Sequence, residues 1–159
     1  MTAKPIVPAE LQSYYDDWRM SPGLLVDGFL FLTGFTGAGS DGTLSEDPET
    51  QMRNAFEKMG LVLRKANLDF NSIVEMTTYH VGLRDHLDLF KAVRSDYVRE
   101  PFPAWTAIEV AGLCPRRRNC RNSRRVRASL LKQSWSAGRP RNLSICSSAE
   151  ISCLRRLNG

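Results

Sequence analysis

Residue types that could bind a metal ion occur in this 159-residue chain without the spacing that a metal site requires. The two histidines, His80 and His86, have no second ligand at a useful distance along the sequence, so we interpret both as structural. The cysteines lie too far apart for the close pairs of a zinc site; they are Cys114, Cys120, Cys146 and Cys153. We therefore expect neither a metal nor a cofactor.

Two other patterns could bind phosphate groups. The segment Gly34-x-x-Gly37-x-Gly39 lacks the Gly-Lys-Ser/Thr ending of a phosphate loop and the spacing of a dinucleotide fingerprint, so we interpret it as a flexible loop. Seven arginines between Arg116 and Arg127 could bind RNA phosphates, with an affinity that falls steeply in salt. No aromatic residues for base stacking are interleaved with them, so we expect nucleic acid to bind this run only non-specifically.

The charge of the chain changes at Cys114. Residues 1–113 hold 10 Lys+Arg and 16 Asp+Glu, a net charge of −6, whereas residues 114–159 hold 12 Lys+Arg and one acid, Glu150, a net charge of +11. This change predicts a domain over residues 1–113 and an Arg/Ser/Cys-rich tail over residues 114–159. The tail has little apolar material to bury, so we expect it to be disordered.

Hydropathy gives no indication of a membrane protein. The longest apolar stretch, Leu24 to Leu32, is interrupted by Asp27 and Gly28 and is far shorter than the ~18–20 residues that span a bilayer. The first residues do not have the charged-then-apolar pattern of a signal peptide. We therefore expect a cytoplasmic location and no membrane partner.

The periodicity of residues 1–113 predicts an α+β domain that follows an irregular lead-in of about twenty residues. Asp27-Gly28 between two apolar runs predicts a β-hairpin. Asp47 and Pro48 begin a helix with an apolar stripe, and a second helix begins near Asp85. Two further strands are predicted, at residues 73–81 and 105–110. The order ββαβαβ places both helices on one face of a sheet.

Four segments of this domain resemble the Rid family, the reactive intermediate deaminases that are also called YjgF or endoribonuclease L-PSP proteins. Three of the segments are residues 31–35, 51–63 and 69–74. The fourth and most specific, residues 102–113 (FPAWTAIEVAGL), is similar to the family's Phe-Pro-Ala-Arg-x-x-x-Glu-Val-Ala-x-Leu. The resemblance implies a chorismate-mutase-like mixed β-sheet with two helices on one face. It also implies a homotrimer that binds small-molecule ligands in clefts between its subunits.

The resemblance also assigns ligand-binding positions. In the family an arginine grips the substrate carboxylate and helps to orient the water that hydrolyses an imine, and Trp105 stands at that position here. Two readings of Trp105 stay open: a stacking wall for a different ligand, or an aromatic residue packed into the core or an interface. Thr33, Gly34 and Lys91 match other ligand-side positions, and Ala107 replaces a small residue that is often cysteine.

The family continues after Leu113 with a last strand of the pattern apolar-Glu-apolar, which lies inside the sheet. With permitted codons for residues 117–125, a reading frame shifted by one base gives Gly-Ala-Ile-Val-Glu-Ile-Arg-Val, a suitable strand. We interpret the tail as frameshifted, so that the family's last strand and its glutamate are missing.

These observations favour a Rid-like protein that binds a small metabolite. It is either a divergent hydrolase of the 2-iminobutanoate/2-iminopropanoate deaminase type or a non-deaminating relative. The alternatives are an RNA-binding or endoribonuclease-type protein that uses the basic segment, and a non-functional frameshifted product.

Overall fold

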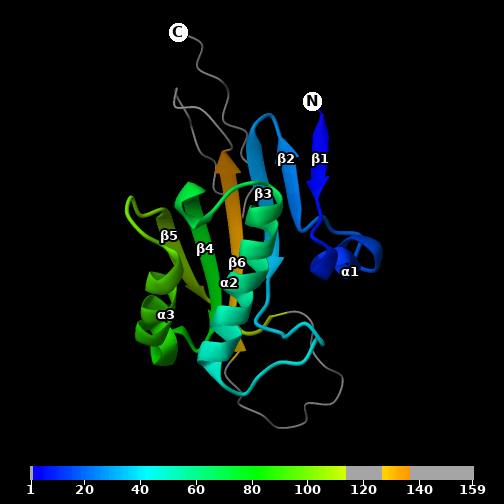
Figure 1. Cartoon of the computed structure of the whole chain (residues 1–159). Helices are drawn as coiled ribbons and strands as arrows, with labels where there is room; N and C mark the ends of the chain where they lie inside the picture. Colours follow the sequence, from blue (N-terminus) through cyan, green and yellow to red (C-terminus); the bar gives the residue numbers. More distant parts are fainter. Residues whose placement is uncertain (1, 114–126, 137–159) are drawn as a thin grey trace.

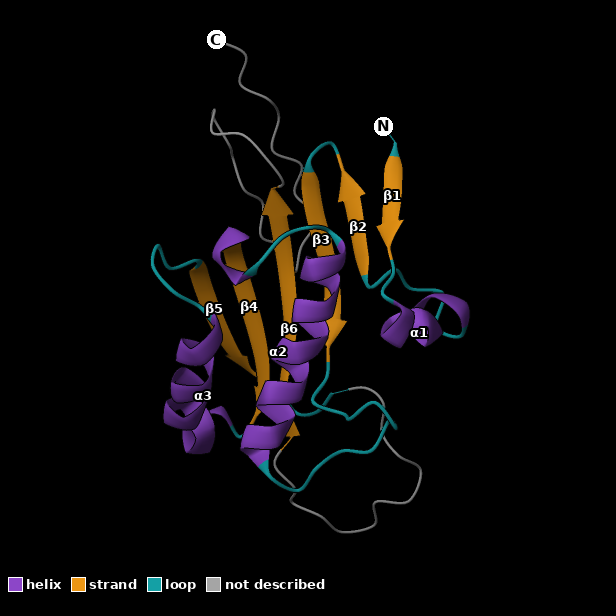
Figure 2. Cartoon of the chain, viewed as in Figure 1, coloured by secondary structure: helices purple, strands orange, loops and turns teal. Residues whose placement is uncertain are grey.

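A six-stranded mixed sheet carries two long helices on one face (Figures 1 and 2). The computed structural model describes residues 2–113 and 127–136. The strands are β1 (Ala3–Ile6), β2 (Gly23–Val26), β3 (Phe29–Phe35), β4 (Ile73–Val81), β5 (Ala104–Glu109) and β6 (Arg127–Ser136). The helices are α1 (Gln12–Asp16), α2 (Pro48–Lys65) and α3 (Leu83–Tyr97), with 3-10 turns at Ala9–Leu11 and Phe70–Ser72. The strand order is β1-β2-β3-β6-β4-β5, in which only β4 and β5 pair in parallel. The predicted α+β class is confirmed.

The hairpin between β2 and β3 turns at the predicted dipeptide. Asp27 has φ 49° and Gly28 has φ 84°, the two positive values that a type I′ turn requires. β2 and β3 then pair antiparallel from Gly23 opposite Leu32 to Val26 opposite Phe29.

Helix α2 begins as its first residues predict. The Asp47 side chain accepts hydrogen bonds from the backbone N–H groups of Glu49 and Thr50, and Pro48 occupies the first turn. The apolar stripe of the helix is buried against the sheet; its members are Met52, Ala55, Phe56, Met59, Val62 and Leu63.

Helix α3 begins at Leu83, two residues before the predicted start, after Gly82 in the left-handed conformation (φ 74°). Phe90 and Val93 form its buried face, as predicted, whereas Leu87 is only half-buried. Aromatic rings join the two helices, with Phe56 stacked on Tyr97 at a centroid distance of 4.6 Å. The Phe56 ring also lies 5.9 Å from Phe90.

The lead-in is more ordered than predicted. β1 pairs antiparallel with β2, and the 3-10 turn at Ala9–Leu11 runs directly into α1. The reason is that Ile6 and Leu11 are buried in the core, so two apolar residues fix a segment that otherwise looks polar.

The tail also differs from the prediction in one segment. Residues 127–136 form β6, which pairs antiparallel with β3 on one side and β4 on the other, the interior place expected for the family's last strand. Without a strand there, β3 and β4 would each present a row of unpaired backbone N–H and C=O groups, so any segment that supplies a partner is favoured. Residues 114–126 and 137–159 lie outside the described residues, as do all four cysteines and most of the arginine run.

None of the helices in the described parts of the chain is both long and apolar enough to cross a membrane.

Candidate functional site

Trp105 lies on β5, half-buried beneath α3. Its indole Nε1 donates a hydrogen bond to Thr78 Oγ1 on β4 (3.0 Å). Its ring stacks on Phe90 at a centroid distance of 5.6 Å, and the guanidinium carbon of Arg94 lies over it at 4.3 Å. The side chain therefore occupies the layer between the sheet and α3, where it contacts two residues of that helix.

A buried polar chain continues from Trp105 into the sheet. Thr78 is fully buried, and its hydroxyl lies 2.8 Å from Nε2 of His80 and 3.5 Å from the carbonyl oxygen of Thr106. His80 is 1% exposed, and its ring meets Phe90 edge-on at 4.7 Å. Burial, aided by the nearby charge of His86, lowers the pKa of His80 to about 4. His80 is therefore neutral at pH 7, which fits the structural interpretation of this residue.

Ala107 and Lys91 lie on β5 and α3, the strand and the helix that also carry Trp105 and Phe90. Ala107 follows Trp105 by two residues on β5, so the two side chains lie on the same face of the sheet. In the parallel pairing of β4 with β5, Ala107 stands opposite Thr78. Lys91 is exposed on α3, and its Nζ lies 3.1 Å from Oδ1 of Asp88.

Thr33 and Gly34 lie elsewhere, on β3, where the pairing with β6 is irregular between Leu32 and Phe35. Thr33 Oγ1 donates a hydrogen bond to Met20 Sδ (2.8 Å). Two strands, β6 and β4, separate β3 from β5, and with about 4.8 Å per strand Thr33 is roughly 14 Å from Trp105 across the sheet. One chain thus brings Trp105 and Ala107 together and holds Thr33 and Gly34 apart from them.

The glycine-rich loop after β3, predicted as flexible, is held by side chains of α2. Lys58 Nζ donates hydrogen bonds to the carbonyl oxygens of Thr36 (3.2 Å) and Ala38 (2.5 Å), and Asn54 Nδ2 donates one to Gly37 (3.2 Å). Partial burial lowers the pKa of Lys58. These donors fix the backbone that follows Thr33 and Gly34.

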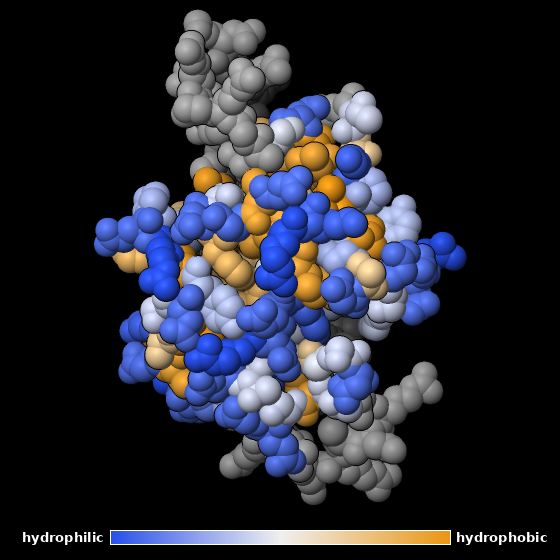
Figure 3. Space-filling model, viewed as in Figure 1, coloured by the Kyte–Doolittle hydropathy of each residue, from blue (hydrophilic) through white to orange (hydrophobic). Residues whose placement is uncertain are grey.

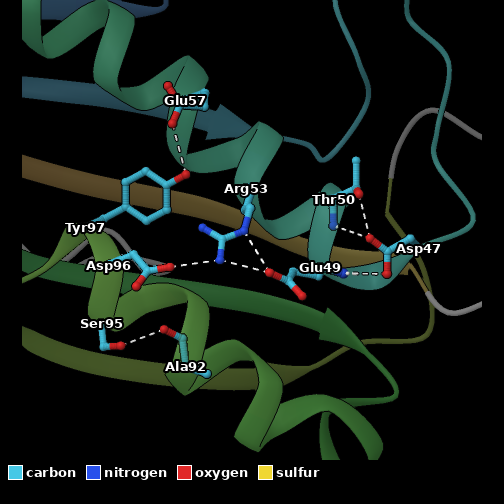
Figure 4. A network of polar contacts seen from close by, with 9 residues as sticks. All are labelled: Asp47, Glu49, Thr50, Arg53, Glu57, Ala92, Ser95, Asp96 and Tyr97. Atoms are coloured by element: carbon cyan, nitrogen blue, oxygen red, sulfur yellow. Dashed lines mark hydrogen bonds and ion pairs between the residues drawn. The ribbon is translucent and has the colours of Figure 1, made fainter.

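Polar contacts on the outer side of the helices fix α3 against α2 (Figure 4). Arg53 Nη2 on α2 lies 2.8 Å from Oδ2 of Asp96 on α3, and Arg53 Nε donates a hydrogen bond to Glu49 (2.9 Å). Tyr97 donates a hydrogen bond to Glu57 (2.9 Å). Each exposed pair contributes little alone, but together with the aromatic stack they hold α3 above Trp105.

Glu75 is another polar group near this region. It stands opposite Ala104 in the pairing of β4 with β5, and its Oε2 is buried without a hydrogen-bond partner among the described residues. Loss of hydration raises the pKa of this carboxyl group.

Sequence reasoning missed Thr78 and Arg94 because both contacts depend on tertiary structure. Thr78 meets Trp105 only through the parallel pairing of β4 with β5. Arg94 follows Phe90, which was predicted to be buried, by four positions. Residues at this spacing lie on the same side of a helix, so the sequence could have predicted that the aliphatic part of the Arg94 side chain lies at the edge of the core. Within residues 2–113 and 127–136, no three side chains of His, Cys, Asp or Glu cluster as a metal site would need.

Comparisons with known proteins agree with this geometry. A family pattern described as Endoribonuclease L-PSP matches residues 16–118. The RutC family protein YjgH of Escherichia coli (strain K12) is 29% identical over 109 residues, which cover 68% of this chain and 83% of that protein. A solved structure of Protein YJGH superposes with a TM-score of 0.73 and 23% identity, covering 88% of this chain and all of the other. The crystal structure of the yeast protein YEO7 gives a TM-score of 0.68 and 18% identity, covering 86% of this chain and 100% of that one.

Proposed function

Because this chain belongs to the endoribonuclease L-PSP family, we propose that it binds a small metabolite at the interfaces of a homotrimer. We further propose that it is a divergent enamine/imine hydrolase of the 2-iminobutanoate/2-iminopropanoate deaminase type. The observation that carries this proposal is the separation of the predicted ligand residues into two groups, one on β3 and one on β5.

A ligand of a few carbon atoms cannot span the roughly 14 Å between these groups within one sheet. If β3 of one subunit faces β5 of the next, Thr33 and Gly34 come to lie beside Trp105 and Ala107 in one cleft. The separation therefore supports a site shared between subunits.

The distribution of apolar side chains also supports an assembly. Helices α2 and α3 cover one face of the sheet, and a space-filling view of that side is a mixture of hydrophilic and apolar residues (Figures 1 and 3). On β3, Phe31 alternates with the buried Leu30 and Leu32, so it projects from the opposite face, where its exposed fraction is 44%. Leu24 stands opposite Phe31 in the pairing of β2 with β3, so it shares that face. Apolar side chains on an uncovered sheet face are typical of a subunit interface.

The proposed reaction adds water to a C=N bond and yields a C=O bond and ammonia. The hydroxyl of Thr33 and the backbone of Gly34 would hold the ligand from one side, and Trp105 would form the apolar wall on the other. The indole N–H is already used by Thr78, and Phe90 and Arg94 contact the ring, so Trp105 would contribute apolar contact beside these two side chains rather than a hydrogen bond.

A subunit-mixing experiment with the full chain tests both parts of the proposal. An amino-acid oxidase supplies the 2-imino acid, and release of 2-oxobutanoate is compared with spontaneous hydrolysis. Gly34→Val and Trp105→Ala are each expected to abolish the enzymatic part, and co-assembly of the two variants should restore activity in about a quarter of the sites. Each variant assembled alone is the control. If mixing restores nothing although trimers form, the site is not shared between subunits; if the unmodified chain does not accelerate hydrolysis, the proposed reaction is wrong.

A second candidate function, RNA binding, is favoured by the seven arginines between Arg116 and Arg127. Replacing Arg116, Arg117 and Arg118 with glutamine should weaken RNA binding and lower its salt dependence if this run carries the function. An unchanged affinity would exclude the run as the binding element.

A further inference from the structure

Arg94 lies on the inner side of α3, over the ring of Trp105. Its guanidinium carbon lies 4.3 Å from the centroid of the Trp105 ring. The residue is half-buried, and this burial lowers the pKa of the guanidinium from its ordinary value, although the group remains charged at neutral pH. A cation on an indole face is stabilised by the ring quadrupole, and the stack fixes the orientation of the planar group.

The charge of Arg94 has no acidic partner in the described parts of the chain. Among the side chains of residues 2–113, no ion pair includes Arg94, and its guanidinium donates none of the side-chain hydrogen bonds. Arg53 on the neighbouring helix is the contrast, because its guanidinium contacts the carboxylates of both Glu49 and Asp96. A partly desolvated cation without a counter-ion is costly, and an anion that binds there lowers that cost.

A guanidinium group whose plane is held in one orientation is suited to binding a carboxylate. Its parallel N–H donors match the two oxygens of a carboxylate, and an ammonium group cannot reproduce this grip. Lys91, three residues earlier on α3, is a neighbour on the helix surface, but its ammonium group is paired with Asp88 at 3.1 Å, so among the described residues Arg94 is the cation left for an anion at this place. The ring of Trp105 gives the same place an apolar wall.

We propose that Arg94, stacked on Trp105, binds the carboxylate group of this protein's ligand. The guanidinium that grips the anion would thus come from α3, while β5 supplies the aromatic surface on which it rests. The identity of the anion as a small 2-oxo or 2-imino acid rests on the proposed function, whereas the carboxylate site itself stands on the contacts of Arg94.

Binding of 2-oxobutanoate, with its neutral amide as the uncharged probe, tests this inference on the full chain. The chain has three tryptophans, and loss of one indole N–H signal in Trp105→Phe identifies the Trp105 resonance in NMR spectra. We expect the acid to shift that resonance and the amide to leave it unchanged at equal concentration. Arg94→Met should weaken binding of the acid by about tenfold to a hundredfold, the range for losing a charge-assisted pair of hydrogen bonds.

Two matched variants separate the charge of Arg94 from the planar shape of its guanidinium group. Arg84→Met removes the same charge from an exposed position in the first turn of α3 and should leave binding unchanged. Arg94→Lys keeps the charge and should still lose most of the affinity, because the planar fork is gone. The Phe90 and Trp105 ring signals report whether each variant keeps the α3–β5 packing.

The outcomes separate this inference from the proposed reaction. Binding that depends on Arg94 without imine hydrolysis would keep the carboxylate site and reject the hydrolase. Hydrolysis that is unaffected by Arg94→Met, or a complete lack of 2-oxobutanoate binding, would overturn the role of Arg94.

Discussion

Burial of the neutral His80 ring should make the stability of the domain depend on pH between about 4 and 6.5. In the unfolded chain the imidazole takes up a proton as the pH falls below 6.5, whereas in the folded chain it stays neutral until about pH 4. Because only the unfolded state gains from protonation in this window, the free energy of unfolding falls as the pH falls. The pKa difference of about 2.5, at 1.36 kcal/mol for each pKa unit, corresponds to a total loss of about 3 kcal/mol.

Urea unfolding between pH 4 and pH 7.5 measures this loss. His80→Gln removes the titrating group, so its free energy of unfolding should fall by about 3 kcal/mol less than that of the unmodified chain over the same range. The variant has a different stability at pH 7 because the packing against Phe90 changes, but the change with pH is the quantity compared. The carboxyl groups titrate in both proteins and cancel in the difference.

A second variant checks the cause of the shift. The charge of His86 contributes to the low pKa of His80, so His86→Gln should raise the pKa of His80. The pH range over which stability is lost should then end at a pH above 4, and its upper limit should stay at about 6.5. If the unmodified chain and His80→Gln lose the same stability between pH 6.5 and pH 4, the imidazole is not buried as described and the reasoning fails.

Three further results are expected. Asp47→Ala should lower the free energy of unfolding by about 1 kcal/mol because the N-terminal N–H groups of α2 lose their acceptor, and Asp47→Asn should lose much less; equal losses by urea denaturation would exclude capping as the cause. Gly37→Ala should destabilise by about 1–3 kcal/mol, since a Cβ there would lie 2.5 Å from the Cβ of Gln51, whereas Gly112→Ala, where a Cβ would meet no atom of the described residues within 4 Å, should be neutral in the same assay. Sequencing of codons 110–130 of the gene should give a reading frame that encodes Gly-Ala-Ile-Val-Glu-Ile, and the intact mass of the protein should agree with that frame. A sequence and a mass that both keep the arginine run would refute the frameshift.

Features fixed by a few neighbouring residues could be predicted from the sequence. Asp27-Gly28 needs only its own dihedral angles to turn the chain, and Asp47 caps α2 through N–H groups two and three residues away. The strand over residues 73–81 was predicted with the bounds that β4 has, because β-branched and aromatic residues fill it.

Features that join distant segments could not be predicted in the same way. The hydrogen bond from Trp105 to Thr78 requires the parallel register of β4 and β5, and the stack of Arg94 on Trp105 requires the packing of α3 onto β5. The hydrogen bond from Thr33 to Met20 requires that the segment between α1 and β2 lie beside β3. Each of these contacts depends on the tertiary structure, which the periodicity of a local segment does not predict.

The interior position of β6 has a consequence for synthesis on the ribosome. The strands that flank it, β3 and β4, leave the ribosome first and must wait for residues 127–136 before their inner edges are paired. The β3–β6 pairing joins residues roughly a hundred positions apart, and contacts of such long range form late. During that interval the nascent chain presents two open edges to other nascent chains and to chaperones. A change of sequence in residues 127–136 therefore acts on the middle of the sheet, and its first effect is on how many chains reach the folded state.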